Sequence, residues 1–191
     1  GTVTDDALLD PLEANYLVGV VAGVNELVGM AWADLSTGRF CAASFPCSQL
    51  MDQYSRIGPS ECLLQEDDQE LLEMLGGTAM LTQRPAWSFA LDDARRTLAG
   101  QFGTSSLEGM GFGDEDGDRA AIRAAGGVLQ YLQETQGGSL DHFQTLVSYC
   151  QGETVDIDGA TWRSLEITRT MRDGRRDGSL LSVMDQTVTA M

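Results

Sequence analysis

The sequence predicts an α/β domain built on a mixed sheet, followed by a mostly helical domain. Three observations point to this order. Three apolar runs of strand length open the 191-residue chain, and short polar turns separate them. Segments with helical spacing then alternate with short apolar runs up to residue 103. Beyond a glycine-rich acidic stretch, helical spacing dominates, so the fold class is α/β and then mostly α.

The opening runs are predicted to form three consecutive antiparallel strands. The strands are expected at about 16–22, 27–35 and 39–45. Between the second and third, Ser36–Gly38 supplies turn residues, and Gly38 tolerates the positive φ of a tight reversal. Asp34 is expected to cap this turn through a hydrogen bond from its side chain to the backbone.

The segment after this meander alternates helices with strands. Helices are expected at 48–57, 67–75 and 91–102, and strands at 61–65 and 80–82. The resulting order resembles the ribonuclease H-like fold. Nuclease chemistry on that fold needs clustered carboxylates for two metals, the first of them on the first strand. The run at 16–23 contains no acid, so no nuclease is expected.

The chain is divided into four parts by composition. Residues 1–15 form a lead-in, 16–103 the sheet domain, 104–117 a glycine-rich linker and 118–191 a helical domain. In the last part, helices are expected at 118–136 and 159–171 and again from 179. Residues 140–149 remain ambiguous, and 154–157 suggest a short extended piece.

Composition limits the function classes. The net charge is −17 and all twelve basic residues are arginine, so a Walker A loop, which needs lysine, is excluded and nonspecific nucleic-acid binding is not expected. No apolar run approaches 18 residues, and the start lacks a basic signal sequence. Four cysteines form no CxxC pair and are expected as free thiols. A cytoplasmic location is expected.

Two candidate sites are weighed against plainer roles. Asp114, Asp116 and Asp118 imitate the first ligands of an EF-hand, but Arg119 and Ala125 stand where glycine and glutamate are needed. A solvated acidic linker is therefore expected. His142, the only histidine, has no nucleophile or metal partner at identifiable spacing, and a structural role is expected.

The arginine-rich stretch 172–178 is the remaining candidate. Arg172, Arg175 and Arg176 lie near the expected end of a helix, and Asp173 and Asp177 partly neutralise them. A solvated or ion-paired role and a contact with phosphate or a partner both stay open. Catalytic, cofactor-binding and metal-ligating residues are not expected in this chain.

Several longer blocks carry a family resemblance. GTVTDDALLD, Asn15–Leu17 and DLSTGRF resemble the start of the connector domain of the MutS family of mismatch repair proteins, and LDDARRTLAGQFGTSSLEGMG resembles its end. AAGGVLQYLQETQ, DGATWRSLEIT and GRRDGSLLSVMDQTVTAM are similar to the start of the core (lever) domain. The order of the blocks matches the family over nearly the whole chain.

The resemblance implies a noncatalytic connector and partial core module taken from a longer protein. In the family, the connector relays conformational change between the mismatch-binding and ATPase domains and presents surface to MutL. The whole protein is a homodimer that binds mismatched double-stranded DNA and uses ATP and Mg²⁺; this part is expected to need no cofactor and no membrane. The alternative is an acidic protein-interaction module on an inactive ribonuclease H-like fold, unrelated to repair.

Overall fold

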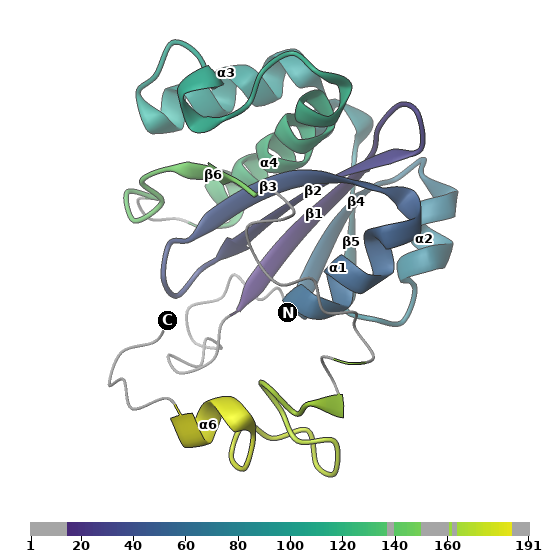
Figure 1. Ribbon diagram of the computed structural model, residues 1–191. Helices are drawn as coiled ribbons and strands as arrows, with labels where there is room; N and C mark the ends of the chain where they lie inside the picture. Colours follow the sequence, from purple (N-terminus) through teal and green to yellow (C-terminus); the bar gives the residue numbers. More distant parts are fainter. Residues whose placement is uncertain (1–14, 137–139, 150–160, 162–163, 185–191) are drawn as a thin grey trace.

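A computed structural model describes residues 15–136, 140–149, 161 and 164–184, and its centre is a six-stranded sheet (Figure 1). The strands are β1 (Tyr16–Ala22), β2 (Leu27–Asp34), β3 (Phe40–Pro46), β4 (Glu61–Gln65), β5 (Met80–Arg84) and β6 (Leu146–Ser148). Their order across the sheet is β5-β4-β1-β2-β3-β6. Only β2 runs against its neighbours, since every other neighbouring pair is parallel. The predicted mixed sheet with flanking helices is confirmed: β4 and β5 extend the meander on the far side of β1.

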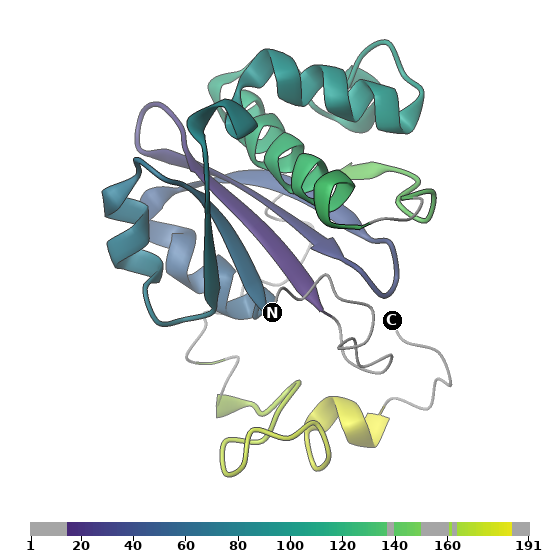
Figure 2. The same cartoon turned by 180° about the vertical axis from the view of Figure 1, so that it is seen from behind.

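Helices cover both faces of the sheet (Figures 1 and 2). The helices are α1 (Leu50–Ile57), α2 (Gln69–Leu75), α3 (Leu91–Phe102), α4 (Asp116–Thr135) and the short α6 (Leu180–Met184). Three 3₁₀ turns are η2 (Cys47–Gln49), η3 (Ala86–Phe89) and η4 (Glu108–Met110). One face carries α1 and α2, whereas α4 crosses the other face with α3 packed on its outer side. The predicted helix at 91–102 is confirmed at both ends.

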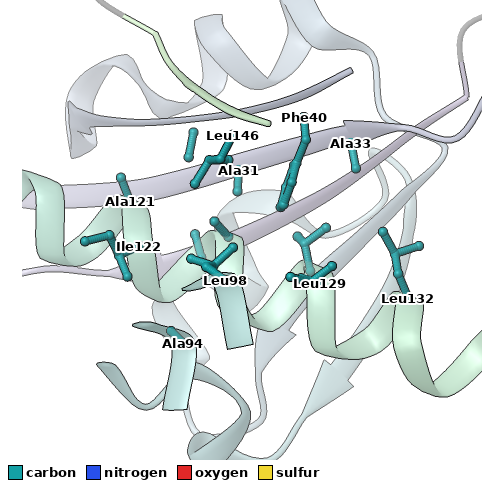
Figure 3. Close-up of a cluster of buried hydrophobic side chains, with 14 of the residues drawn as sticks. Ala31, Ala33, Phe40, Ala94, Leu98, Ala121, Ile122, Leu129, Leu132 and Leu146 are labelled. Atoms are coloured by element: carbon teal, nitrogen blue, oxygen red, sulfur yellow. The ribbon is translucent and has the colours of Figure 1, made fainter. Parts of the chain in front are cut away.

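Two apolar cores lie on the two faces, and the strands alternate between them. On β2, Ala31 and Ala33 face α4, whereas Met30 and Trp32 face the side covered by α1 and α2. Burial on both sides explains why the strands read as nearly continuous apolar runs. Figure 3 shows the α4 side of this arrangement, where Leu129 and Leu132 of α4 point toward the sheet.

Glycines let α4 approach the sheet and α3 very closely. A Cβ added to Gly29 would lie 2.1 Å from the carbonyl oxygen of Ala120, so the strand and helix backbones touch. Within α4, a Cβ on Gly126 would lie 2.2 Å from the Cβ of Ala94 in α3. A glycine inside a helix costs roughly 1 kcal/mol relative to alanine. Here the close approach of a second helix requires it.

The predicted division of the chain at 104–117 is wrong for the described residues. Helix α4 shares one buried cluster with the strands, and β6 pairs in parallel with β3. Leu107 and Phe112 of the supposed linker are buried in the same cluster. Periodicity correctly indicated an amphipathic helix at this point, but it does not say which surface the apolar stripe covers.

The helix predicted at 159–171 is helical at its described residues 161 and 164 but is wrong from residue 165 on. Residues 165–171 form turns and bends, and Glu166 has a positive φ of 48°. Backbone hydrogen bonds close this segment on itself, from the N–H of Leu180 to the carbonyl of Glu166 and from that of Leu181 to Ile167, both 2.9 Å. The helix expected from 179 is present as α6, while 154–157 lie outside the described residues. The ambiguous stretch 140–149 contains β6.

Candidate functional site

The turn between β2 and β3 uses both oxygens of one buried carboxylate. Asp34 is 1% exposed; its Oδ1 accepts from the backbone N–H of Ser36 at 2.9 Å, and its Oδ2 accepts from the hydroxyl of Thr37 at 2.7 Å. Gly38 has a φ of 73°, as a tight reversal requires. The predicted capping role of Asp34 is confirmed, and its oxygens are occupied within the turn.

His142 packs beside the same turn. A Cβ added to Gly38 would lie 2.3 Å from the carbonyl oxygen of His142, so the loop before β6 lies directly against the hairpin. The imidazole is exposed and lies 4.2 Å from the ring of Phe143, measured between centroids. The expectation of a structural histidine agrees with this position.

The acid cluster at 114–118 does not converge on one point. Asp114 pairs with Arg95 of α3, Asp116 Oδ2 accepts from the side-chain N–H of Asn25 at 3.2 Å, and Asp118 Oδ2 accepts from the backbone of Gly113 at 2.8 Å. Arg95 lowers the pKa of Asp114 through its hydrogen bond and its charge. In the part of the chain that the structure describes, no three His, Cys, Asp or Glu side chains could hold a metal. Asp114 and Asp116 are exposed, so the expected solvated role of the acids agrees with the structure. Asp116 and Asp118 lie in the first turn of α4, not in a linker.

A hollow lies beside this cluster. It has a volume of about 170 Å³ and lies between α3 and the segment 105–114, with Arg95, Asp114 and Phe112 in its lining. Arg95 and Asp114 of this lining form an ion pair. Because the lining combines both signs of charge with apolar side chains, it does not indicate one class of ligand.

The three candidate arginines lie on one closed loop. The N–H of Thr170 donates to the carbonyl of Arg175 at 2.9 Å, and the N–H of Gly174 donates back to Thr170 at 3.0 Å. Arg172 and Arg175 are exposed, and Arg176 is half-buried. The structure thus brings the three together on one segment, but it does not test their predicted role.

A buried polar group that the sequence did not reveal joins α4 to the sheet. Glu61 is fully buried at the start of β4, and its Oε1 accepts from the hydroxyls of Tyr131 and Thr82, both at 2.7 Å. Burial, followed by the hydrogen bond to Glu61, raises the pKa of Tyr131. The signal in the sequence was a lone carboxylate opening the apolar run ECLLQ, where a strand covered on both faces demands a partner for it.

Two arginines reinforce the attachment of α4. Arg84 pairs with Glu134 at 2.5 Å, and its guanidinium lies 5.6 Å from the ring centroid of Tyr131. Arg123 donates to the carbonyls of Phe89 and Ala22, each at 2.9 Å. Burial lowers the pKa of Arg123, because the charged guanidinium loses part of its hydration. Hydrogen bonds to the two carbonyl oxygens replace some of that lost hydration. Both arginines hold elements of the fold together.

Three of the four cysteines are described and are free thiols, as predicted. Cys41 and Cys62 are buried, Cys47 is half-buried, and Cys150 lies outside the described residues. Burial raises the pKa of Cys62 to about 12 and also raises that of Cys41. Both thiols therefore stay protonated near neutral pH, which makes them poor nucleophiles. Among the described residues, no helix is both long and apolar enough to cross a membrane.

Comparisons with known proteins place this fold. The MutS domain II family model matches residues 15–144, more than half of the chain. The DNA mismatch repair protein MutS of Rhodopirellula baltica is 49% identical over 210 aligned residues, covering 100% of this chain and 23% of that protein. The catalytic core domain of BIV integrase is 17% identical, with 64% of this chain and 86% of that one covered. Its TM-score of 0.23 is too low to support an inference about fold or function.

The family match begins one residue before β1 and ends just before β6, so it covers five strands and the helices α1 to α4. The chain spans only 23% of the length of the curated relative, and that relative is matched at 49% identity. The sheet unit and the resemblance of its blocks lead to the same assignment. This chain belongs to the MutS domain II family, the connector domain of DNA mismatch repair proteins.

Proposed function

We propose that this chain is a noncatalytic connector module of a MutS protein, together with the first part of its core domain. It transmits conformational change between a mismatch-binding domain and an ATPase domain. Family membership over residues 15–144 carries this proposal. The described carboxylates Asp34 and Glu61 support it, because both are committed to hydrogen bonds within the fold and not to a reaction.

The connector unit is proposed to run from residue 15 to 149. Its support is the packing of α4 on the sheet and the pairing of β6 with β3. The segment 164–184 then belongs to the core part. A single packed unit suits a relay, because a displacement at one end of α4 moves the elements against which it packs.

The proposed partners are MutL, a second MutS subunit and mismatched double-stranded DNA, the last through the whole protein. ATP and Mg²⁺ are proposed for the ATPase domain of the whole protein, and the location is proposed to be cytoplasmic. The net charge of −17 supports protein contacts over direct contact of the sheet unit with DNA phosphates.

Binding to MutL tests the partner assignment. This chain, immobilised, is expected to retain the N-terminal domain of MutL above the level seen with an acidic protein of matched charge and size. The matched control removes nonspecific attraction between charges. Equal retention by both surfaces would refute the MutL contact.

We also propose that Arg172, Arg175 and Arg176 contact phosphate when the whole protein binds DNA. Replacing all three with Ser is expected to weaken binding most at low salt and to reduce the slope of log K against log salt by about 0.9 for each lost phosphate contact. Arg96→Ser is the control, because Arg96 is exposed on α3 and paired with Asp93. An unchanged slope in the triple variant would exclude a phosphate role.

The runner-up, an acidic interaction module unrelated to repair, is weakened by the family match. A nuclease is the remaining class on this fold. We expect no magnesium-dependent cleavage of an RNA–DNA hybrid duplex by this chain. Cleavage that disappears in an Asp34→Asn variant would overturn the noncatalytic proposal.

A further inference from the structure

The chain leaves the sheet through its shortest strand. β6 has three residues and, within the described part of the chain, pairs with β3 alone, through Phe40↔Leu146, Cys41↔Val147 and Ala42↔Ser148. By contrast, β1 and β2 share seven register pairs. The family match ends at residue 144, before this strand begins. β6 is the edge strand of the described sheet, next to β3 (Figure 1).

The residues just before β6 are firmly anchored. Phe143 is 1% exposed, and its ring meets that of Phe40 edge-on at 5.9 Å. The carbonyl of Leu140 accepts from the side chain of Gln101 at 3.0 Å, and His142 lies against the backbone of Gly38. Contacts with α3, β3 and the hairpin turn thus hold residues 140–143 in place.

The attachment of the next six residues is slight. Leu146 is buried in the core on the α4 face, but Val147 is 44% exposed. Beyond the strand, the N–H of Tyr149 donates to the carbonyl of Ala42 at 3.0 Å. The Tyr149 ring lies 5.5 Å from that of Trp32, edge-on, and belongs to the opposite face of the sheet. Leu146 and Tyr149 hold this edge on opposite faces of the sheet, the Tyr149 ring also lies 6.4 Å from that of Phe45, and Ser148 lies beside Gly111.

We propose that residues 144–149 form a releasable strap, in which β6 detaches from β3 while the rest of the sheet stays folded. Short edge strands with few buried contacts open at lower free energy than central strands. Release would free six residues, which reach about 20 Å when extended, between the anchor at Phe143 and the chain beyond Tyr149. The strap supplies a moving part for the relay and in that role rests on the function proposed above.

Hydrogen exchange tests the strap directly on this chain. The amides of 146–149 are expected to exchange about 100-fold faster than those of Met30–Trp32 in β2. Low concentrations of denaturant should not accelerate this exchange, because the strap opens locally and the rest of the sheet stays folded. Leu146→Ala should accelerate exchange in the strap and leave β2 unchanged. Val147→Ser is the matched control, since its side chain is half in solvent. Equal protection of β6 and β2 would overturn the proposal, as would global loss of protection in Leu146→Ala.

A reversible staple provides a second test. Cys41 is the register partner of Val147, and neighbouring strands lie about 4.8 Å apart, within the Cα separation that a disulfide spans. In Val147→Cys, the new thiol lies at a half-exposed position and should attack oxidised glutathione, releasing one reduced glutathione. The Cys41 thiol, which becomes accessible when the strap opens, then displaces the second glutathione and closes the disulfide. Exchange of 146–149 should then slow toward the β2 rate and recover on reduction. The same variant with Cys41→Ala should not respond; if no staple forms, exchange in Leu146→Ala decides the question.

The strap and the proposed function fail in different ways. Exchange in this chain does not depend on any partner, so a mobile strap without MutL binding would refute the partner assignment alone. MutL binding with a fully protected β6 would refute the strap alone.

Discussion

Helix α4 and the segment 164–184 look alike in the sequence and differ in the structure. Both carry apolar residues at helical spacing. The second segment was predicted to contain the end of one helix, a loop at 172–178 and a further helix from 179. α4 lies against three strands and α3, with Val128, Leu129 and Leu132 fully buried. In the second segment Met171, Val183 and Met184 are 70%, 73% and 70% exposed, and a turn at Glu166 interrupts the helical pattern.

The difference shows that a segment with helical spacing forms a stable helix when its apolar face packs against another surface of the protein. Isolated helices shorter than about 12–15 residues are marginal in water, and packing supplies most of the stability of helices in proteins. α4 has the sheet as its template. Among its described contacts, the segment 164–184 is held by hydrogen bonds within itself and buries little apolar surface.

The largest expected effect comes from separating α4 from the sheet. Gly29→Val places side-chain atoms where the carbonyl of Ala120 now lies, and backbone atoms cannot give way cheaply. We expect the free energy of unfolding to fall by about 3 kcal/mol or more, measured by urea titration. Gly100→Ala is the control: nothing lies within 4 Å of that site in α3, so it should be neutral or stabilise by up to about 1 kcal/mol. A mild effect of Gly29→Val would show that the contact between helix and strand is loose.

A smaller loss is expected from the buried polar group under α4. Tyr131→Phe removes one of the two hydroxyls that donate to Glu61 and leaves the carboxylate less satisfied. The unfolding free energy should fall by about 1–2 kcal/mol. Thr135→Val removes a hydroxyl bond to the backbone in the last turn of the same helix and should cost less. Equal losses in the two variants would contradict a special role for the buried group.

Two residues with a positive φ, one in each region, can show whether the two regions unfold in the same transition. Glu26 in the β1–β2 turn has a φ of 58°, and Glu166 has a φ of 48°. Glu26→Gly should raise the unfolding free energy of the sheet unit by about 1 kcal/mol, because glycine accepts this conformation without steric cost. Glu166→Gly should leave the main unfolding transition unchanged. A shared response would mean that the two regions unfold together.

The smallest effect is expected on the exposed segment. Val183→Ser removes an apolar side chain that is 73% exposed, so the main transition should move by less than about 0.5 kcal/mol. Thermal unfolding monitored by near-UV circular dichroism measures it, with Val128→Ser in α4 as the buried counterpart. A large shift in Val183→Ser would mean that the segment packs on the sheet unit in solution.

The local signals in the sequence proved sound where neighbouring residues decide the outcome. The strands of the meander, the turn with its cap at Asp34 and the helix at 91–102 depend on residues close in sequence. The family assignment likewise followed from blocks of consecutive residues and is supported by the match over 15–144. Propensity, capping and turn chemistry act over a few residues, so the sequence alone determines them.

The tertiary structure decided what lies across long separations in the chain. Glu61 meets Tyr131 across 70 positions, and β6 joins β3 more than 100 residues later. It also decided that α4 belongs to the sheet unit and that residues 165–171 turn. These four features have the same physical reason. An apolar stripe or a buried carboxylate in the sequence indicates that some partner is required. Which partner it contacts depends on the surfaces that the folded chain brings together.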